Sequence, residues 1–438
     1  MTSLRTAPGS RPMPPAPVQT GRSTDTIAAP SRLPAWPLLT LMYGFPFFWV
    51  TGTSLFAPIT LGAIMGMFLL LRGHVRTAPG VLCWFAFLAW VAVCAVSITG
   101  FMQLVGFGQR AADLLAVGIA FVYYVNARES ISVTHVLRGL TVIWFTVVTL
   151  GLLATQFSDF RLTTPLSHVI PGSLLGNELV RELVLPRLAE VQDPWGAEEP
   201  FVRPAAPFPY TNSWGMAYAL LTPVMVLVWT RLRSRAARFL LTVALLASLY
   251  PAAQTSNRGM LIALAVFAVF IAARFVLAGS FRTSVTVVGL LVLATIGAAA
   301  GGVFSAIAER QEVSHTTSGR GAIYEATFQK VLQSPIVGWA TPGMDPTIGI
   351  ALGTQGYAWT LLYSYGFIGI VLFYIFLARV VTASWHLRTP EAHVFLSLVA
   401  TIALTIWFYG LGVTQCLILL MAVAVLSRSI AEGCVADG

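Results

Sequence analysis

Long apolar stretches dominate this chain and set the strongest limit on its fold. Runs near 20 residues recur along it, and 57% of the 438 residues are hydrophobic while only 10% are charged. A soluble domain carries about 25% charged residues, and about 20 apolar residues suffice for a helix to cross a bilayer core. A membrane barrel would show alternating segments of about ten residues, which are not seen. The sequence therefore predicts an all-α polytopic membrane protein.

Twelve apolar runs are predicted to be membrane-spanning helices of one domain, 36–429. They lie at about 36–53, 54–72, 80–100, 111–127, 137–156, 212–230, 238–253, 259–278, 283–304, 356–380, 391–411 and 413–429. Residues 1–35 are rich in Pro, Ser, Ala and Arg without a periodic pattern, which predicts a disordered tail. Residues 430–438 form a second short tail.

The arginines indicate how these spans are oriented. With twelve spans, the arginine-rich connections all fall on the side of the N-terminal tail, which predicts that this side is cytoplasmic. They hold Arg72, Arg76, Arg128, Arg138, Arg231, Arg233, Arg235, Arg238, Arg274, Arg282, Arg379 and Arg388. We therefore expect a multi-pass protein of the cytoplasmic (inner) membrane with both termini in the cytoplasm. The same bias explains the net charge of +9 without nucleic acid as a partner.

Two long connections, at about 157–211 and 305–355, are predicted to face outward. They hold eleven of the seventeen acidic residues. Connections of this length are usually functional. The four cysteines show no metal-ligand spacing, so no metal site is predicted from them. Arg110 and Asp113, three residues apart at the outer edge of the fourth span, are candidates for a pair on one helix face.

Arg258 lies in a short outer connection, in the stretch QTSNRG that precedes an apolar helix. Ser256 or Asn257 can cap that helix, whose first N–H groups form an anion site. Gly259 allows close approach to the backbone, and an arginine fork suits phosphate oxygens. A snorkelling arginine at the membrane boundary is the alternative explanation.

Arg320 has a similar setting in the second outer connection, where SHTTSGR precedes an amphipathic stretch that runs to Leu332. Two such arginines on one side suggest a clamp for a diphosphate. A solvated arginine paired with Glu325 is the alternative explanation.

These segments together resemble the O-antigen ligase/polymerase superfamily of bacterial envelope glycosyltransferases. The resemblance rests on SNRG before an apolar helix, TTSGR with Tyr324 four residues on, SPIVGWATPG, and YSYGFIGIVLF. The stretch RPAAPFPYTNSWGMAYALLTP, which begins at Arg203 and contains Asn212, also resembles the family's segment after its first outer loop. The similarity covers about residues 200–380.

The resemblance implies a C-type glycosyltransferase fold that acts at the outer leaflet. The donor would be a glycan on polyprenyl diphosphate, attacked by a hydroxyl of an acceptor glycan, with no cofactor. Arg258 and Arg320 would grip the leaving diphosphate. Arg203, Asn212, Ser256, Gly259, Tyr324 and Asp345 are the candidate substrate-binding residues. A flippase and chain-length or export components would be further partners.

One position departs from the family pattern. The family's two glycine motifs correspond here to Pro335–Gly338 and Gly366–Gly369. Members place a histidine eleven residues before the first glycine of the second motif, where this chain has Gln355. An amide cannot act as a general base, although it can orient a hydroxyl. His315, Glu325 and Asp345 are the outer candidates for a base, although a solvated loop residue is the favoured explanation of each.

Three functions are considered for such a membrane protein: polymerase, ligase and transporter. A polymerase of lipid-linked glycans is favoured over a ligase with a distinct acceptor, because the nearly lysine-free composition is typical of a high-GC genome and makes a lipopolysaccharide acceptor less fitting. A transporter or flippase of lipid-linked glycans would carry ionisable groups near the bilayer midplane, and almost none are seen.

Overall fold

The computed structural model describes residues 32–172, 174–176, 178–192, 200–314, 316–345 and 349–436, and helices form most of it. The helices are α1 (Trp36–Tyr43), α2 (Phe45–Thr51), α3 (Ala57–Arg72), α4 (Val81–Val93), α5 (Phe101–Asn126), α6 (Val133–Ala154), α7 (Glu178–Val184), α8 (Thr211–Arg231), α9 (Arg235–Gln254), α10 (Arg258–Leu277), α11 (Phe281–Ala300), α12 (Val303–Ser314), α13 (Thr316–Gln333), α14 (Tyr357–Ser384), α15 (Pro390–Thr405) and α16 (Val413–Ala436).

Two small antiparallel hairpins complete the described structure. In the first, β1 (Ala189–Gln192) pairs with β2 (Phe201–Pro204), with Glu190 opposite Arg203. In the second, β3 (Gly343–Asp345) pairs with β4 (Ile350–Leu352). Both hairpins lie in the two long connections that the sequence predicts to be functional.

Eight helices in the described part of the chain are long and apolar enough to cross a membrane: α5, α6, α8, α9, α10, α11, α14 and α16. Three shorter apolar helices are α3, α4 with its 3₁₀ extension to Ser97, and α15. The protein is therefore an all-α membrane protein, as predicted. Each of the twelve predicted runs contains helix, while the number that cross the membrane stays a prediction.

Several predicted boundaries differ from the structure. The run 36–53 is divided at Gly44 into α1 and α2, and α5 begins ten residues earlier than predicted, at Phe101. The sequence around Gly106 and Gly108 looks unlike a span, but packing of the adjacent Phe107, which is buried, favours helix there. The predicted connection 305–355 holds most of α12 and all of α13, so it is largely helical.

The two predicted tails are also shorter than expected. Residue Leu33 is buried, and its carbonyl accepts a hydrogen bond from the Ser130 hydroxyl at 2.6 Å, so the last residues of the predicted N-terminal tail pack on the bundle. Residues 1–31 lie outside the described part of the chain. At the other end, α16 continues to Ala436.

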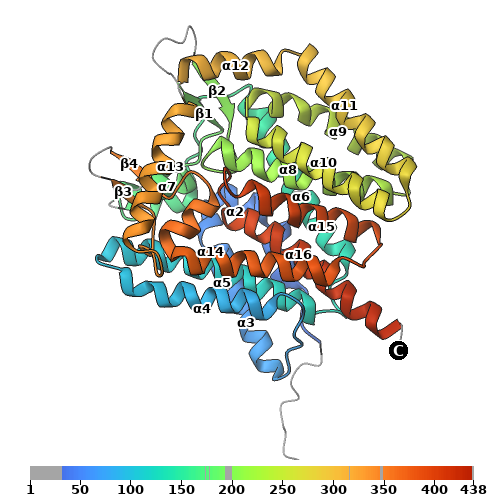
Figure 1. The fold of residues 1–438 in the computed structure, drawn as a ribbon, viewed down its shortest axis with the longest axis horizontal. Coiled ribbons are helices and arrows are strands. Elements are labelled where there is room, and N and C mark those ends of the chain that lie inside the picture. The colour runs from blue at the N-terminus through green and yellow to red at the C-terminus, as the bar shows by residue number, and fades with distance from the viewer. Residues whose placement is uncertain are drawn as a thin grey trace, which may run out of the picture.

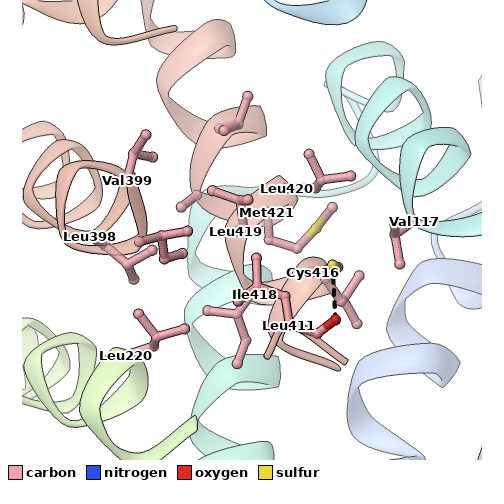
Figure 2. Packing of buried hydrophobic residues seen from close by; sticks show 14 of the residues in the cluster. Val117, Leu220, Leu398, Val399, Leu411, Cys416, Ile418, Leu419, Leu420 and Met421 are labelled. Carbon is pink, nitrogen blue, oxygen red and sulfur yellow. Dashed lines mark hydrogen bonds between the residues drawn. The ribbon is translucent and has the colours of Figure 1, made fainter. Parts of the chain in front are cut away.

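Helix α16 lies at the centre of the bundle, between α5, α14 and α15 (Figure 1). Its residues Leu417–Leu426 are all buried, and side chains from α5, α8 and α15 pack against this stretch (Figure 2). Helices α9, α10 and α11 lie on one side of the bundle, and α3, α4 and α5 on the other (Figure 1). Helix α11 packs on α10 and α12 and leaves most of its apolar surface exposed, as expected of a lipid-facing helix.

Helix α14 is broken at Gly366, whose φ of 65° and ψ of −170° are not helical. The turn Pro335–Gly338 packs into this break. The N–H of Phe367 donates to the Pro335 carbonyl at 2.8 Å, and the N–H of Trp339 donates to the Tyr363 carbonyl at 2.8 Å. A Cβ at Gly366 would overlap the Ile336 carbonyl oxygen, and only glycine readily adopts that backbone conformation. The two glycine motifs of the sequence are therefore one packing unit.

Candidate functional site

The N-terminus of α10 forms the centre of the candidate site. Asn257 is its N-cap, and the Asn257 side chain accepts a hydrogen bond from the Met260 N–H at 3.3 Å. This confirms one of the two predicted caps. Ser256 has a φ of 44°, a left-handed conformation that non-glycine residues adopt rarely. The tight turn at Ser256 places Arg258 in the first position of the helix, where it is half-buried.

Tyr409, in the connection between α15 and α16, fixes the Asn257 cap. Its hydroxyl donates to Asn257 Oδ1 at 2.8 Å, and both side chains are buried. On the other side, Asn257 Nδ2 lies 3.4 Å from Oδ1 of Asn212, at the start of α8. A Cβ at Gly259 would come within 3.0 Å of the Tyr409 ring. The space predicted at Gly259 is thus taken up by Tyr409.

The same connection also holds the segment that contains Gln355. The N–H of Tyr357 donates to the Tyr409 carbonyl at 2.7 Å, and the N–H of Ala358 donates to the Ile406 carbonyl at 2.9 Å. The Gln355 side chain is half-buried and makes no hydrogen bond to another described residue. Residues 406–409 therefore join two segments that the sequence singles out separately, around Arg258 and around Gln355.

The first hairpin supports the turn before α10. Arg203 is buried, and its Nε donates to the Thr255 carbonyl at 2.8 Å. A guanidinium nitrogen of Arg203 lies 4.0 Å from Glu190, whose other carboxylate oxygen accepts from the Thr211 N–H at 3.0 Å. Burial alone would raise the pKa of Glu190, but the Thr211 N–H and the Arg203 charge more than offset it and lower that pKa. Arg203 thus positions the 255–257 turn.

Helix α13 meets the site through stacked aromatic rings. The ring of Tyr324 stacks on Trp359 with 4.8 Å between centroids, and Trp359 meets Trp407 edge to face at 5.8 Å. Tyr324 is therefore brought to the same connection as Asn257. The neighbouring Glu325 is exposed and accepts a hydrogen bond from Gln329 on its own helix.

The structure does not bring the remaining predicted residues to the N-terminus of α10. Arg320 lies in the second turn of α13, because that helix begins at Thr316, and its side chain is outside what the structure describes. His315 lies outside the described residues altogether. Asp345 ends β3, and its charge acts on the Tyr363 hydroxyl. The structure brings Arg258, Ser256, Gly259, Asn212, Arg203, Tyr324 and Gln355 to one region and leaves Glu325 at its edge.

Tyr409 and Trp407 are the residues of this region that the sequence did not single out. They lie at the end of an apolar run, where aromatic residues are common, so composition carries no signal for them. The break in the run at Tyr409-Gly410-Leu411-Gly412 is the one available sign of a non-helical connection.

The arrangement places the cation of Arg258 in the first turn of an apolar helix, at the positive end of the helix dipole. Such a site favours an anion such as a phosphate. No group of three or more His, Cys, Asp or Glu side chains in the described part of the chain is arranged to hold a metal ion. No protein-family model matches this chain, and no curated protein matches it.

Proposed function

We propose that this protein is a membrane glycosyltransferase of the O-antigen ligase/polymerase type. It moves a glycan from polyprenyl diphosphate to a hydroxyl of an acceptor glycan at the outer face of the cytoplasmic membrane, as a polysaccharide polymerase. The proposal includes twelve spans with both termini in the cytoplasm. Its partners are the lipid-linked donor, the acceptor glycan and the bilayer.

The observation that supports this proposal most is the convergence of separate motif segments on residues 406–409. Asn257, next to Arg258, bonds to the Tyr409 side chain, while Tyr357, next to Gln355, bonds to the Tyr409 backbone. Tyr324 reaches the same connection through Trp359 and Trp407. Segments far apart in the chain need such a common contact if they are to act on one substrate.

The reaction needs what Arg258 can supply. When the bond between the anomeric carbon and the diphosphate breaks, negative charge grows on the leaving group. A fixed guanidinium at a helix N-terminus stabilises that charge, and loss of one such donor costs about 10²–10³-fold in rate. Arg320, with its α13 neighbour Tyr324 beside the site, is proposed as a second contact to the same group.

The proposal is tested with purified protein in liposomes and a lipid-linked repeat unit as donor. Chain growth is followed by electrophoresis of labelled glycan. Arg258→Ala should lower the rate of chain growth about 100-fold or more, whereas Arg282→Ala, an exposed arginine at the far end of α10 and α11, should leave it unchanged. Absence of any glycan transfer by the wild-type protein would overturn the proposal. Transfer only to a different acceptor glycan would instead identify a ligase.

A further inference from the structure

A cavity of about 550 Å³ follows α14 from Trp359 to Ala378, and Phe328 of α13 and Trp407 complete its wall. We call it the α14 groove. At 1.5 Å per residue, this stretch of helix is up to about 28 Å long, close to the thickness of a bilayer core of about 30 Å. The volume lies within the range of about 300–1,000 Å³ that is usual for ligand pockets. The groove therefore has the dimensions needed by an extended hydrocarbon chain.

The surface of the α14 groove is apolar and is open to the outside of the bundle. Every residue that lines it is aliphatic or aromatic. Its side chains Val371 and Ile375 are exposed, while Leu362 is buried. The hydroxyl of Tyr374, another lining residue, donates to the Ala403 carbonyl of α15 at 2.8 Å, so it is already committed within the protein. A chain that enters from the bilayer therefore meets only hydrocarbon and aromatic surface.

The α14 groove crosses the break in α14 at Gly366. Leu362 lines it before the break, and Phe367 and Ile370 line it after the break. The N–H of Phe367 donates to the Pro335 carbonyl at 2.8 Å, so the turn that packs into the break also holds the first lining residue of the second half. The two halves of the groove are therefore fixed in place, and a preformed site costs less ordering when a ligand binds.

Aromatic rings gather at one end of the α14 groove. Trp359 and Trp407 both line it, and their rings meet edge to face with 5.8 Å between centroids. Tyr324 stacks on Trp359 at 4.8 Å. Phe328 follows Tyr324 by four residues, so both lie on the same face of α13, which packs on α14 (Figure 1).

This aromatic end adjoins the candidate site. Trp407 precedes Tyr409 by two residues, and the Tyr409 hydroxyl donates to Asn257 Oδ1 at 2.8 Å. The N–H of Ala358, in the first turn of α14, donates to the Ile406 carbonyl at 2.9 Å. One end of the groove and the N-cap of α10 are therefore both held by residues 406–409.

We propose that the α14 groove binds the isoprenoid chain of the donor while the diphosphate of the donor lies at Arg258. This rests on the proposed function. A lipid whose head is at the outer face must return its chain to the bilayer, and the groove begins beside the site. Lipid is as apolar as the groove, so the preference for one chain comes from the fit of the contacts. An isoprenoid carries a double bond and a methyl branch in each unit, and the large flat rings of Trp359 and Trp407 offer it more contact than they offer a straight acyl chain.

The test compares two donors in the liposome assay, one with a long polyprenyl chain and one with a geranyl chain of two isoprene units. In Val371→Trp the larger side chain fills the groove twelve residues beyond Trp359, up to about 18 Å along α14. A long chain must pass that point, whereas a geranyl chain ends before it. Val371→Trp should therefore lower the rate with the long-chain donor about 10-fold or more and leave the rate with the geranyl donor unchanged.

The matched control is Val292→Trp in α11. Val292 is 51% exposed and Val371 is 52% exposed, but Val292 lies outside the groove. Val292→Trp should match the wild type with both donors. A wild-type rate of Val371→Trp with the long-chain donor would overturn the assignment, and so would an equal loss with both donors, which indicates general damage.

Binding is measured independently of turnover with a polyprenyl diphosphate that carries a photoreactive diazirine on its chain. Crosslinks should form at Ile375 in the wild type and in Val292→Trp, and should fall about 10-fold or more in Val371→Trp. Excess unlabelled polyprenyl diphosphate should remove them, and excess phosphatidylglycerol should not. Crosslinks outside the groove, or equal competition by phosphatidylglycerol, would overturn the assignment. If the crosslinks form at Ile375 but the wild type transfers no glycan, the proposed function fails while the groove remains an isoprenoid site.

Discussion

Replacement of Gly366 by alanine is expected to damage the packing unit of the two glycine motifs. The new Cβ would overlap the Ile336 carbonyl oxygen, and alanine rarely adopts the φ of 65° and ψ of −170° found there. Such a conformation costs about 1–3 kcal/mol in a non-glycine residue. If the turn Pro335–Gly338 moved away from α14 to relieve the overlap, the hydrogen bonds donated by Phe367 and Trp339 would be lost. Each contributes about 1 kcal/mol.

These contributions sum to about 4 kcal/mol of lost stability. An unfolding entropy of about 2.1 cal/mol/K per residue gives about 0.9 kcal/mol/K for the 438 residues, so Tm should fall by about 4–5 °C. The measurement is thermal unfolding in detergent, followed by tryptophan fluorescence. The matched control is Gly108→Ala in α5, where a Cβ would have no neighbour within 4 Å and helix propensity favours alanine by about 0.5–1 kcal/mol. Equal Tm values for the two variants would refute the reasoning.

Two further predictions concern the site. Tyr409→Phe removes the hydrogen bond to Asn257 Oδ1, so we expect a stability loss of about 1 kcal/mol together with slower chain growth in the liposome assay. An unchanged rate would show that the Asn257 cap does not need Tyr409. The pKa of Glu190 is lower in the folded protein, so its stabilising effect is complete above the unfolded-state pKa of about 4.3 and is lost as pH falls through the folded-state pKa. In thermal unfolding, Glu190→Gln should therefore be less stable than the wild type at pH 7, and this difference in stability should shrink in acid. A stability difference that persists in acid would contradict this.

Local chemistry made the α10 terminus predictable. A Ser-Asn pair before Arg-Gly and an apolar run indicates a capped helix, and the structure has Asn257 in that position. The register of a cap depends on neighbouring residues alone, so it can be inferred from the sequence. The predicted start of α13 is less accurate, because Thr316–Ser318 form the first residues of the helix instead of preceding it.

Tertiary contacts account for what the sequence did not reveal. Gly338 and Gly366 belong to glycine motifs that the sequence shows. Only the fold reveals that the backbone around each glycine packs directly against the other, where a Cβ would overlap it. Tyr409 lies 152 residues from Asn257, and no pattern in either segment predicts that pairing.

The link between Tyr409 and Asn257 also has a consequence for biogenesis. Membrane helices are inserted from the N-terminus as the ribosome synthesises the chain, so α10 is in place long before residues 406–409 emerge. Until then the turn at Ser256 has no Tyr409 to hold its cap, and the Gln355 segment has no backbone partner. A nascent chain that already contains every motif is therefore still incomplete at this site. The contacts that complete the α10 terminus therefore form only after residues 406–409 have been synthesised.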